Sequence, residues 1–167
     1  MAVEGVVEYP RSPHPRQSGT LHLVSEFAPS NIALEPSARL IRDFRAGRLI
    51  PVLSDVTAAE VTDAPEAVRE LHQELLVLAG PVLPITPKVV DLGAAYEARK
   101  ILGAKYEADM RHIALATVAQ VDALVSWNFR HIVRLEKIRL FNAVNVELGY
   151  RALNILSPRE VTTHEDT

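Results

Sequence analysis

Residues 109–158 read DMRHIALATVAQVDALVSWNFRHIVRLEKIRLFNAVNVELGYRALNILSP, and this stretch decides the fold class. It predicts a helix, a strand, a second helix and a last short strand, at residues 106–119, 123–127, 131–148 and 154–156. Met110, Ile113 and Val118 lie on one face of the first helix. Alternating strands and helices are typical of a parallel sheet covered on both faces.

The same alternation extends toward the N-terminus. Helices are predicted over residues 36–46, 57–62, 65–78 and 86–102, and strands over residues 20–25, 49–53 and 82–85. Gly47 and Gly149 follow two of the helices, as expected of helix ends, and Thr86 suits a helix start. Ser157 and Glu160 have the spacing of a capping box. We therefore expect an α/β protein with three α/β/α layers and a central parallel sheet of four or five strands.

The length of 167 residues predicts one domain. Residues 1–19 contain three prolines and no apolar period, so we expect a flexible leader there and a single domain over residues 20–167. No apolar run approaches the roughly 18 residues of a membrane span, and no signal peptide is expected. The absence of cysteine excludes disulfides, thiolate zinc sites and a cysteine nucleophile, which fits a cytoplasmic protein.

The overall charge is slightly acidic. A net charge of −3 excludes nucleic-acid binding through bulk positive charge, so any such contact needs a local basic patch. One such run follows residue 128 and contains Arg130, Arg134, Lys137 and Arg139. It is either a solvated helix face or a set of phosphate contacts.

Ligands in parallel α/β sheets bind beyond the carboxyl ends of the strands. Glu60, Asp109 and Asn128 are expected at that edge, and all three carry oxygen donors. Oxygen donors suit Mg²⁺ or Mn²⁺, which can activate water for attack on a phosphoryl group. The alternatives are that Glu60 and Asp109 only stabilise helix starts and that Asn128 only forms a turn.

The motifs D-x-x-HIALA from Asp109, D-x-LVSWNFRHIV from Asp122 and I-x-x-FNAVN-x-x-x-GY, followed by I-x-SP, closely resemble a bacterial subgroup of PIN-domain proteins. Members of this subgroup are described as VapC-like toxins of toxin–antitoxin pairs. Upstream, LSDVTAAEVTDAPEAVREL resembles the second block of the subgroup, so the resemblance covers residues 37–161. It implies a PIN-like fold and a metal-dependent endonuclease acting on single-stranded RNA, with an antitoxin protein as a partner.

The resemblance also implies roles for individual residues. Glu60 matches the acid of the second block, Asp109 the acid that opens the HIALA helix, and Asn128 the polar residue after the strand. Asp122 matches the pattern too, but it precedes the strand and we expect a structural role. The chain departs from the family at its start, because the strand that ends in Asp-Thr-Ser or Asp-Thr-Asn is missing. Glu26 is the nearest replacement for that acid, and a wrong start site, a frameshift or degeneration would each explain the loss.

Two further side chains have two readings each. His112 is either a ligand or proton-transfer group beside Asp109 or a hydrogen-bonded core histidine. Trp127 either stacks on a base or packs in the core or the wall of the cleft.

Three hypotheses of function follow from the sequence. The first is a Mg²⁺- or Mn²⁺-dependent endoribonuclease, impaired by loss of the first acid. The second is a degenerate PIN fold that binds RNA or a protein without cutting, and the third is an interaction domain that forms a homodimer through its long helices.

Overall fold

The structure is a computed structural model that describes residues 19–23, 31–80 and 82–162, with residues 19–23 and 31–34 described by their backbone alone. The expected leader over residues 1–18 and the candidate acid Glu26 lie outside these ranges. Helices and strands alternate along most of the described chain. In order they are β1 Gly19–Leu23, α1 Asn31–Arg45, β2 Leu49–Val52, α2 Asp55–Val61, α3 Glu66–Leu78, α4 Pro87–Ala98, a 3-10 turn Ala104–Tyr106, α5 Glu107–Val118, β3 Ala123–Val125, α6 Leu135–Glu147, β4 Ile155–Leu156 and α7 Pro158–Thr162.

The strands lie side by side in the order β2-β1-β3-β4, and each neighbouring pair is parallel. The strands are short, and β4 has only two residues. The N-terminal strand β1 lies between β2 and β3. Because all three run in parallel, the carboxyl end of β1 lies between the carboxyl ends of β2 and β3. The prediction of a mixed α/β chain built on parallel strands is confirmed.

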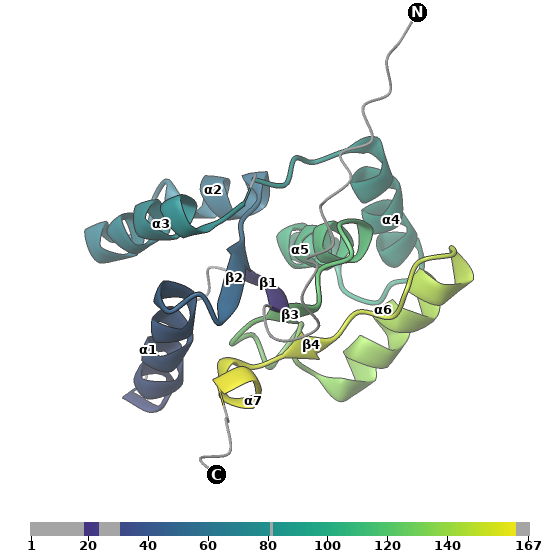
Figure 1. The fold of residues 1–167 in the computed structure, drawn as a ribbon. Coiled ribbons are helices and arrows are strands. Elements are labelled where there is room, and N and C mark those ends of the chain that lie inside the picture. Colours follow the sequence, from purple (N-terminus) through teal and green to yellow (C-terminus); the bar gives the residue numbers. More distant parts are fainter. Residues whose placement is uncertain (1–18, 24–30, 81, 163–167) are drawn as a thin grey trace, which may run out of the picture.

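Helices cover both faces of this sheet, with α1 and α3 on one side and α4, α5 and α6 on the other (Figure 1). The strand side chains alternate between the two sides, as β-strand geometry requires. Ala123 and Val125 of β3 pack with Phe44 of α1 in one apolar cluster. Leu124 belongs to the other cluster, with Ile113 of α5. One apolar core therefore packs on each face of the sheet, and together the two cores fix the position of the sheet between its helices.

Several element ends agree with the sequence. Gly47 and Gly149 adopt φ angles of +68° and +84° just after α1 and α6, a conformation that glycine reaches without strain. The capping box is confirmed, because a Glu160 carboxylate oxygen accepts hydrogen bonds from the main-chain N–H and hydroxyl of Ser157 over 2.7 and 2.8 Å. This double contact begins α7.

Other boundaries were predicted wrongly. The strand expected over residues 82–85 is a single parallel bridge between Leu83 and Ser54. The strand expected over residues 123–127 ends at Val125, and the helix expected from residue 131 begins at Leu135. Helix α1 begins at Asn31, before the predicted start at residue 36, so Pro36 lies inside the helix. Thr86 precedes α4 but makes no side-chain capping bond.

Among the helices of the described residues, none combines the length and the apolar character that crossing a bilayer requires.

Candidate functional site

Glu60 and His112 join two helices near the carboxyl edge of the sheet. Nε2 of His112 in α5 donates a hydrogen bond to Oε1 of Glu60 in α2 over 2.9 Å, since a carboxylate can only accept. His112 is fully buried, whereas the Glu60 side chain remains 30% exposed. The buried His112 ring therefore holds the partly exposed Glu60 carboxylate in place. The interpretation of His112 as a hydrogen-bonded core histidine is confirmed.

Asp109 lies three residues before His112, in the first turn of α5. Its Oδ2 accepts a hydrogen bond of 3.4 Å from the amide nitrogen of Asn128, which follows β3 after two residues. The structure thus brings two of the predicted site residues into direct contact. Because His112 bonds Glu60 and acts electrostatically on Asp109, all three predicted residues belong to one neighbourhood.

Asn128 shapes the turn between β3 and α6. Its Oδ1 accepts a hydrogen bond from the main-chain N–H of His131 over 2.9 Å, and its own N–H donates to Ser126 Oγ over 2.9 Å. Its main-chain oxygen accepts from the N–H groups of Ile132 and Val133. The turn therefore directs the amide N–H₂ of Asn128, and not its oxygen, toward Asp109, so Asn128 positions this carboxylate.

The charge on Asp109 is costly in its surroundings. Burial raises the pKa of Asp109, and the nearby carboxylate of Glu60 raises it as well. His131, His112 and the hydrogen bond from Asn128 oppose that shift of the pKa and favour the charged form. Glu60 and Asp109 are thus near enough for their like charges to interact.

A basic and aromatic surface borders Asp109 on the side of His131. The rings of Tyr106 and His131 stack with centroids 3.9 Å apart, and Nζ of Lys105 lies 4.9 Å from the Tyr106 centroid. Sequence reasoning missed Tyr106 and Lys105, because they precede α5 and meet His131 only through the tertiary fold. A local signal existed, since Lys105-Tyr106 lies just upstream of Asp109.

Trp127 and Phe129 lie on either side of Asn128 in sequence. Nε1 of Trp127 donates to Ser37 Oγ of α1 over 2.9 Å, so this ring is anchored and partly buried. Phe129, whose centroid is 6.1 Å from that of Trp127, is 53% exposed. The contacts of Trp127 therefore favour the packing interpretation over stacking on a base, and Phe129 is the more exposed of the two rings.

The two carboxylates fit a hard cation by their chemistry, because Mg²⁺ and Mn²⁺ prefer oxygen ligands. The further acid that the family resemblance implies, the Asp after the first strand, has no match in this sequence. Within residues 19–23, 31–80 and 82–162, no group of three or more His, Cys, Asp or Glu side chains is placed to hold a metal ion. The Oδ1 of Asn128, the third predicted ligand, accepts a hydrogen bond from the N–H of His131 and keeps a second lone pair, so its role as a ligand stays a prediction.

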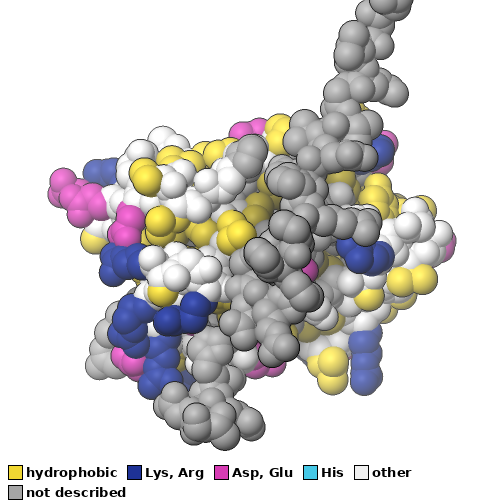
Figure 2. Space-filling view, viewed as in Figure 1, with side chains coloured by type: hydrophobic (Ala, Val, Ile, Leu, Met, Phe, Trp, Pro, Cys, Tyr) yellow, Lys and Arg dark blue, Asp and Glu magenta, His cyan; other side chains and the backbone are white. Residues whose placement is uncertain are grey.

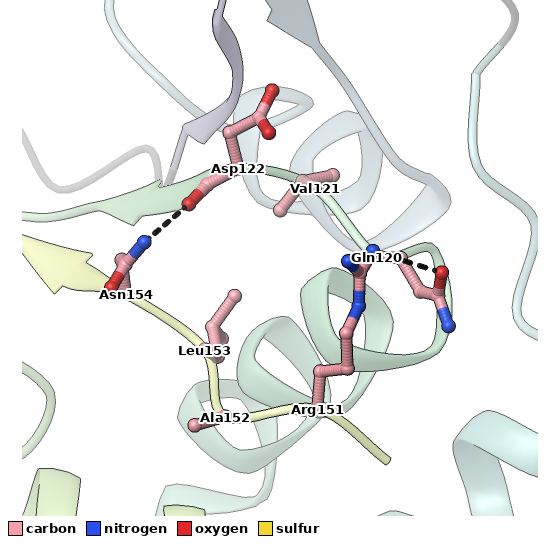
Figure 3. A pocket seen from close by; sticks show the side chains of 7 residues that line it. All are labelled: Gln120, Val121, Asp122, Arg151, Ala152, Leu153 and Asn154. Atoms are coloured by element: carbon pink, nitrogen blue, oxygen red, sulfur yellow. Dashed lines mark hydrogen bonds between the residues drawn. The ribbon is translucent and has the colours of Figure 1, made fainter. Parts of the chain in front are cut away.

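A pocket lies at the opposite, amino edge of the sheet, lined by residues 120–122 and 151–154 (Figure 3). Arg151 donates to the Gln120 side chain there over 3.1 Å, and the side chain of Asn154 donates to the main-chain oxygen of Asp122 over 3.0 Å. Asp122 thus lies before β3, whereas Asn128 lies after it. The main-chain oxygen of Asp122 links the start of β3 to the start of β4, far from Glu60 and Asp109 along the strands.

No protein-family model matches the chain, and no curated protein or solved structure matches it. The resemblance carried by residues 109–158 therefore stays a prediction.

Proposed function

We propose that the protein is a PIN-like, metal-dependent endoribonuclease of the VapC-like toxin type, which hydrolyses phosphodiester bonds of single-stranded RNA. The observation that supports this most is the convergence of Glu60 and Asp109 around His112 at the carboxyl edge of a parallel sheet. A PIN-like sheet of four or five strands in three layers, an antitoxin partner, a homodimer and a cytoplasmic location belong to the same proposal.

Glu60 and Asp109 would hold a Mg²⁺ or Mn²⁺ ion. Bound there, such an ion supplies positive charge to the phosphoryl group and a more acidic water. The remaining groups position this pair: buried His112 fixes Glu60, and Asn128 fixes Asp109. Because the described residues supply only two carboxylates, we expect weak affinity for the ion and slow hydrolysis.

An assay of single-stranded RNA cleavage under titrated Mg²⁺ or Mn²⁺ tests this function. Asp109→Asn keeps the shape and the contact with Asn128 but removes the charge, so we expect cleavage to fall by about 100-fold or more, roughly 2.7 kcal/mol in the barrier. Asp91→Asn removes the charge of an exposed aspartate on α4 and should leave the rate unchanged. Equal cleavage by wild type and Asp109→Asn, or cleavage insensitive to EDTA, would show that the activity belongs to a contaminant.

The second candidate function is RNA binding without hydrolysis. It is favoured by one observation: Glu60 and Asp109 each have a hydrogen-bonding partner within the fold, so the pair persists without an ion. Stable binding of single-stranded RNA with no turnover in either metal would identify this function.

A further inference from the structure

The basic side chains of this protein differ in what neutralises them. In the view of Figure 2, Lys and Arg side chains gather over α1, with acidic side chains among them. These arginines are paired: Arg39 and Arg42 with Glu35, and Arg45 with Glu74. The patch over α1 is therefore largely cancelled by its own carboxylates and offers little to an outside anion.

The basic groups around His131 are arranged differently. Lys105 lies against the Tyr106 ring that stacks on His131, and Nζ of Lys137 donates to the main-chain oxygen of Ile101 over 2.6 Å. Burial lowers the pKa of His131, and Arg130, Lys105 and Lys137 lower it further, while Asp109 opposes them. Three cations thus act on one ring that borders the acidic pair.

No carboxylate of the described ranges forms an ion pair with Lys105, Arg130 or Lys137. The neighbouring basic residues Arg111 and Arg134 are paired, with Glu107 and Glu136. We call Lys105, Arg130 and Lys137 the basic flank. Among the described residues its positive charge has no ion-pair partner, which makes it complementary to an anion.

An exposed aromatic ring adjoins this flank. Phe129 lies between Asn128 and Arg130 in the sequence, and its side chain is 53% exposed. An exposed ring beside cations is the arrangement with which proteins hold single-stranded nucleic acid, because each unpaired base can stack while the phosphates meet the cations. The bases of a duplex are already stacked and leave such a ring unused.

We propose that the basic flank and Phe129 form the track along which single-stranded RNA enters the acidic site, with Lys105, Arg130 and Lys137 contacting phosphates and Phe129 stacking on one base. The part of this inference that leads the RNA to Glu60 and Asp109 rests on the proposed function. Binding of RNA to the track can be measured without hydrolysis. Each phosphate contact on a single strand contributes about 0.7 to the slope of log affinity against log salt, so three contacts predict a slope of about 2.

The test is filter binding of a single-stranded oligoribonucleotide to the full chain in EDTA, over a series of salt concentrations. The double variant Lys105→Gln/Arg130→Gln removes two exposed cations of the flank and is expected to weaken binding at low salt by about tenfold or more and to lower the slope to about 0.7. The matched control Arg45→Gln/Arg151→Gln removes the same charge before β2 and β4, at the amino edge of the sheet. It should bind as wild type does.

A further variant separates stacking from charge. Phe129→Ser should weaken binding by about tenfold and leave the salt slope unchanged, because no phosphate contact is lost. Calorimetric melting of each variant shows whether it is folded before binding is compared.

Three results would overturn the inference: equal losses in the flank and control variants, equal affinity for duplex and single-stranded RNA, or equally tight binding of polyglutamate. If the flank governs binding but wild type never cleaves, the track stands and the nuclease function fails. If Asp109→Asn abolishes cleavage while the flank variants bind normally, the nuclease function stands and the track fails.

Discussion

Asp109 is a carboxylate whose surroundings disfavour its charged form. Its carboxylate is partly buried at the start of α5, close enough to Glu60 for like charges to interact. A fold selected only for stability would place a neutral group there, since the charged form is the one that burial disfavours. The position therefore stands as a candidate for a functional role on physical grounds that are independent of the family resemblance.

The first prediction concerns the stability of Asp109→Asn. We expect this variant to melt higher than wild type near neutral pH, by up to about 3 °C, which is about 1 kcal/mol for a chain of this size. Because the pKa of Asp109 is raised in the folded state, the folded protein retains this proton to higher pH than the unfolded chain does. Wild type thus loses stability as pH rises from the ordinary aspartate pKa through the raised one.

Calorimetric melting between about pH 4 and pH 8 measures this difference. The gap between variant and wild type should widen with pH and then level off. A gap that is constant, or that narrows as pH rises, would mean that the charge of Asp109 is compensated in the fold. Asp91→Asn, on the exposed surface of α4, should show no such trend.

Among the elements, α4, α5 and α6 are joined by a buried polar network. The Tyr96 hydroxyl of α4 donates to Asn145 Oδ1 of α6, and Nδ2 of Asn145 donates to Thr117 Oγ1 of α5 over 3.2 Å. Tyr96 and Asn145 have no exposed surface. The network sets the mutual placement of three helices, including α5, which carries Asp109 and His112.

The second prediction is that Asn145→Ala destabilises the protein by about 2–3 kcal/mol, because it leaves the Tyr96 and Thr117 hydroxyls buried without this partner. The melting temperature should fall by roughly 4–12 °C. Val146→Ala changes the adjacent side chain on the same helix, which is 61% exposed, and serves as the control. If both variants melt alike, the network is not what holds the helices together.

Elements with strong periodicity were predicted well. The bounds of helix α5 match their prediction closely, although residues 112–117 are all buried and the helix is covered on more than the one face that its apolar spacing indicated. The start of α6 was missed, since Asn128 captures the N–H groups of residues 131–133 and holds them in a turn whose apolar residues still look helical in sequence. The strand over residues 82–85 failed because its apolar residues meet only one bridging partner, Ser54, which local pattern cannot show.

The site was predicted in part. The rule that ligands bind at carboxyl ends of parallel strands picked out Glu60, Asp109 and Asn128, and the structure gathers them. The bond between Glu60 and His112 spans 52 positions of the chain and the stack of Tyr106 on His131 spans 25, so neither follows from local spacing. The direction of the Asn128 amide depends on which backbone N–H its oxygen meets, which only the folded turn decides.

At the scale of the whole molecule, the chain has a net charge of −3, and the proposed site would bring acidic and basic side chains together at one edge of the sheet. Glu60 and Asp109 provide the negative charge and the basic flank the positive charge. The third prediction follows from having two described carboxylates: Mg²⁺ or Mn²⁺ should stabilise the protein only modestly. If the dissociation constant is about 1 mM, then about 10 mM Mg²⁺ adds roughly 1.4 kcal/mol, a rise of about 3–6 °C in melting temperature.

Calorimetric melting with and without the ion measures this stabilisation, and Asp109→Asn should remove it while Asp91→Asn keeps it. A melting temperature of wild type that ignores both metals would contradict cation binding at this edge. A rise several times larger would point to more ligands than Glu60 and Asp109 provide.

Trp127 gives this molecule a built-in optical reporter. It is the only tryptophan in the chain, it borders Asn128, and its indole N–H is held by Ser37. Its tryptophan fluorescence therefore reports on a single position, beside Asn128 and near the exposed ring of Phe129. Quenching or a spectral shift of that emission on adding a nucleotide would register occupancy directly, without a label or a further substitution.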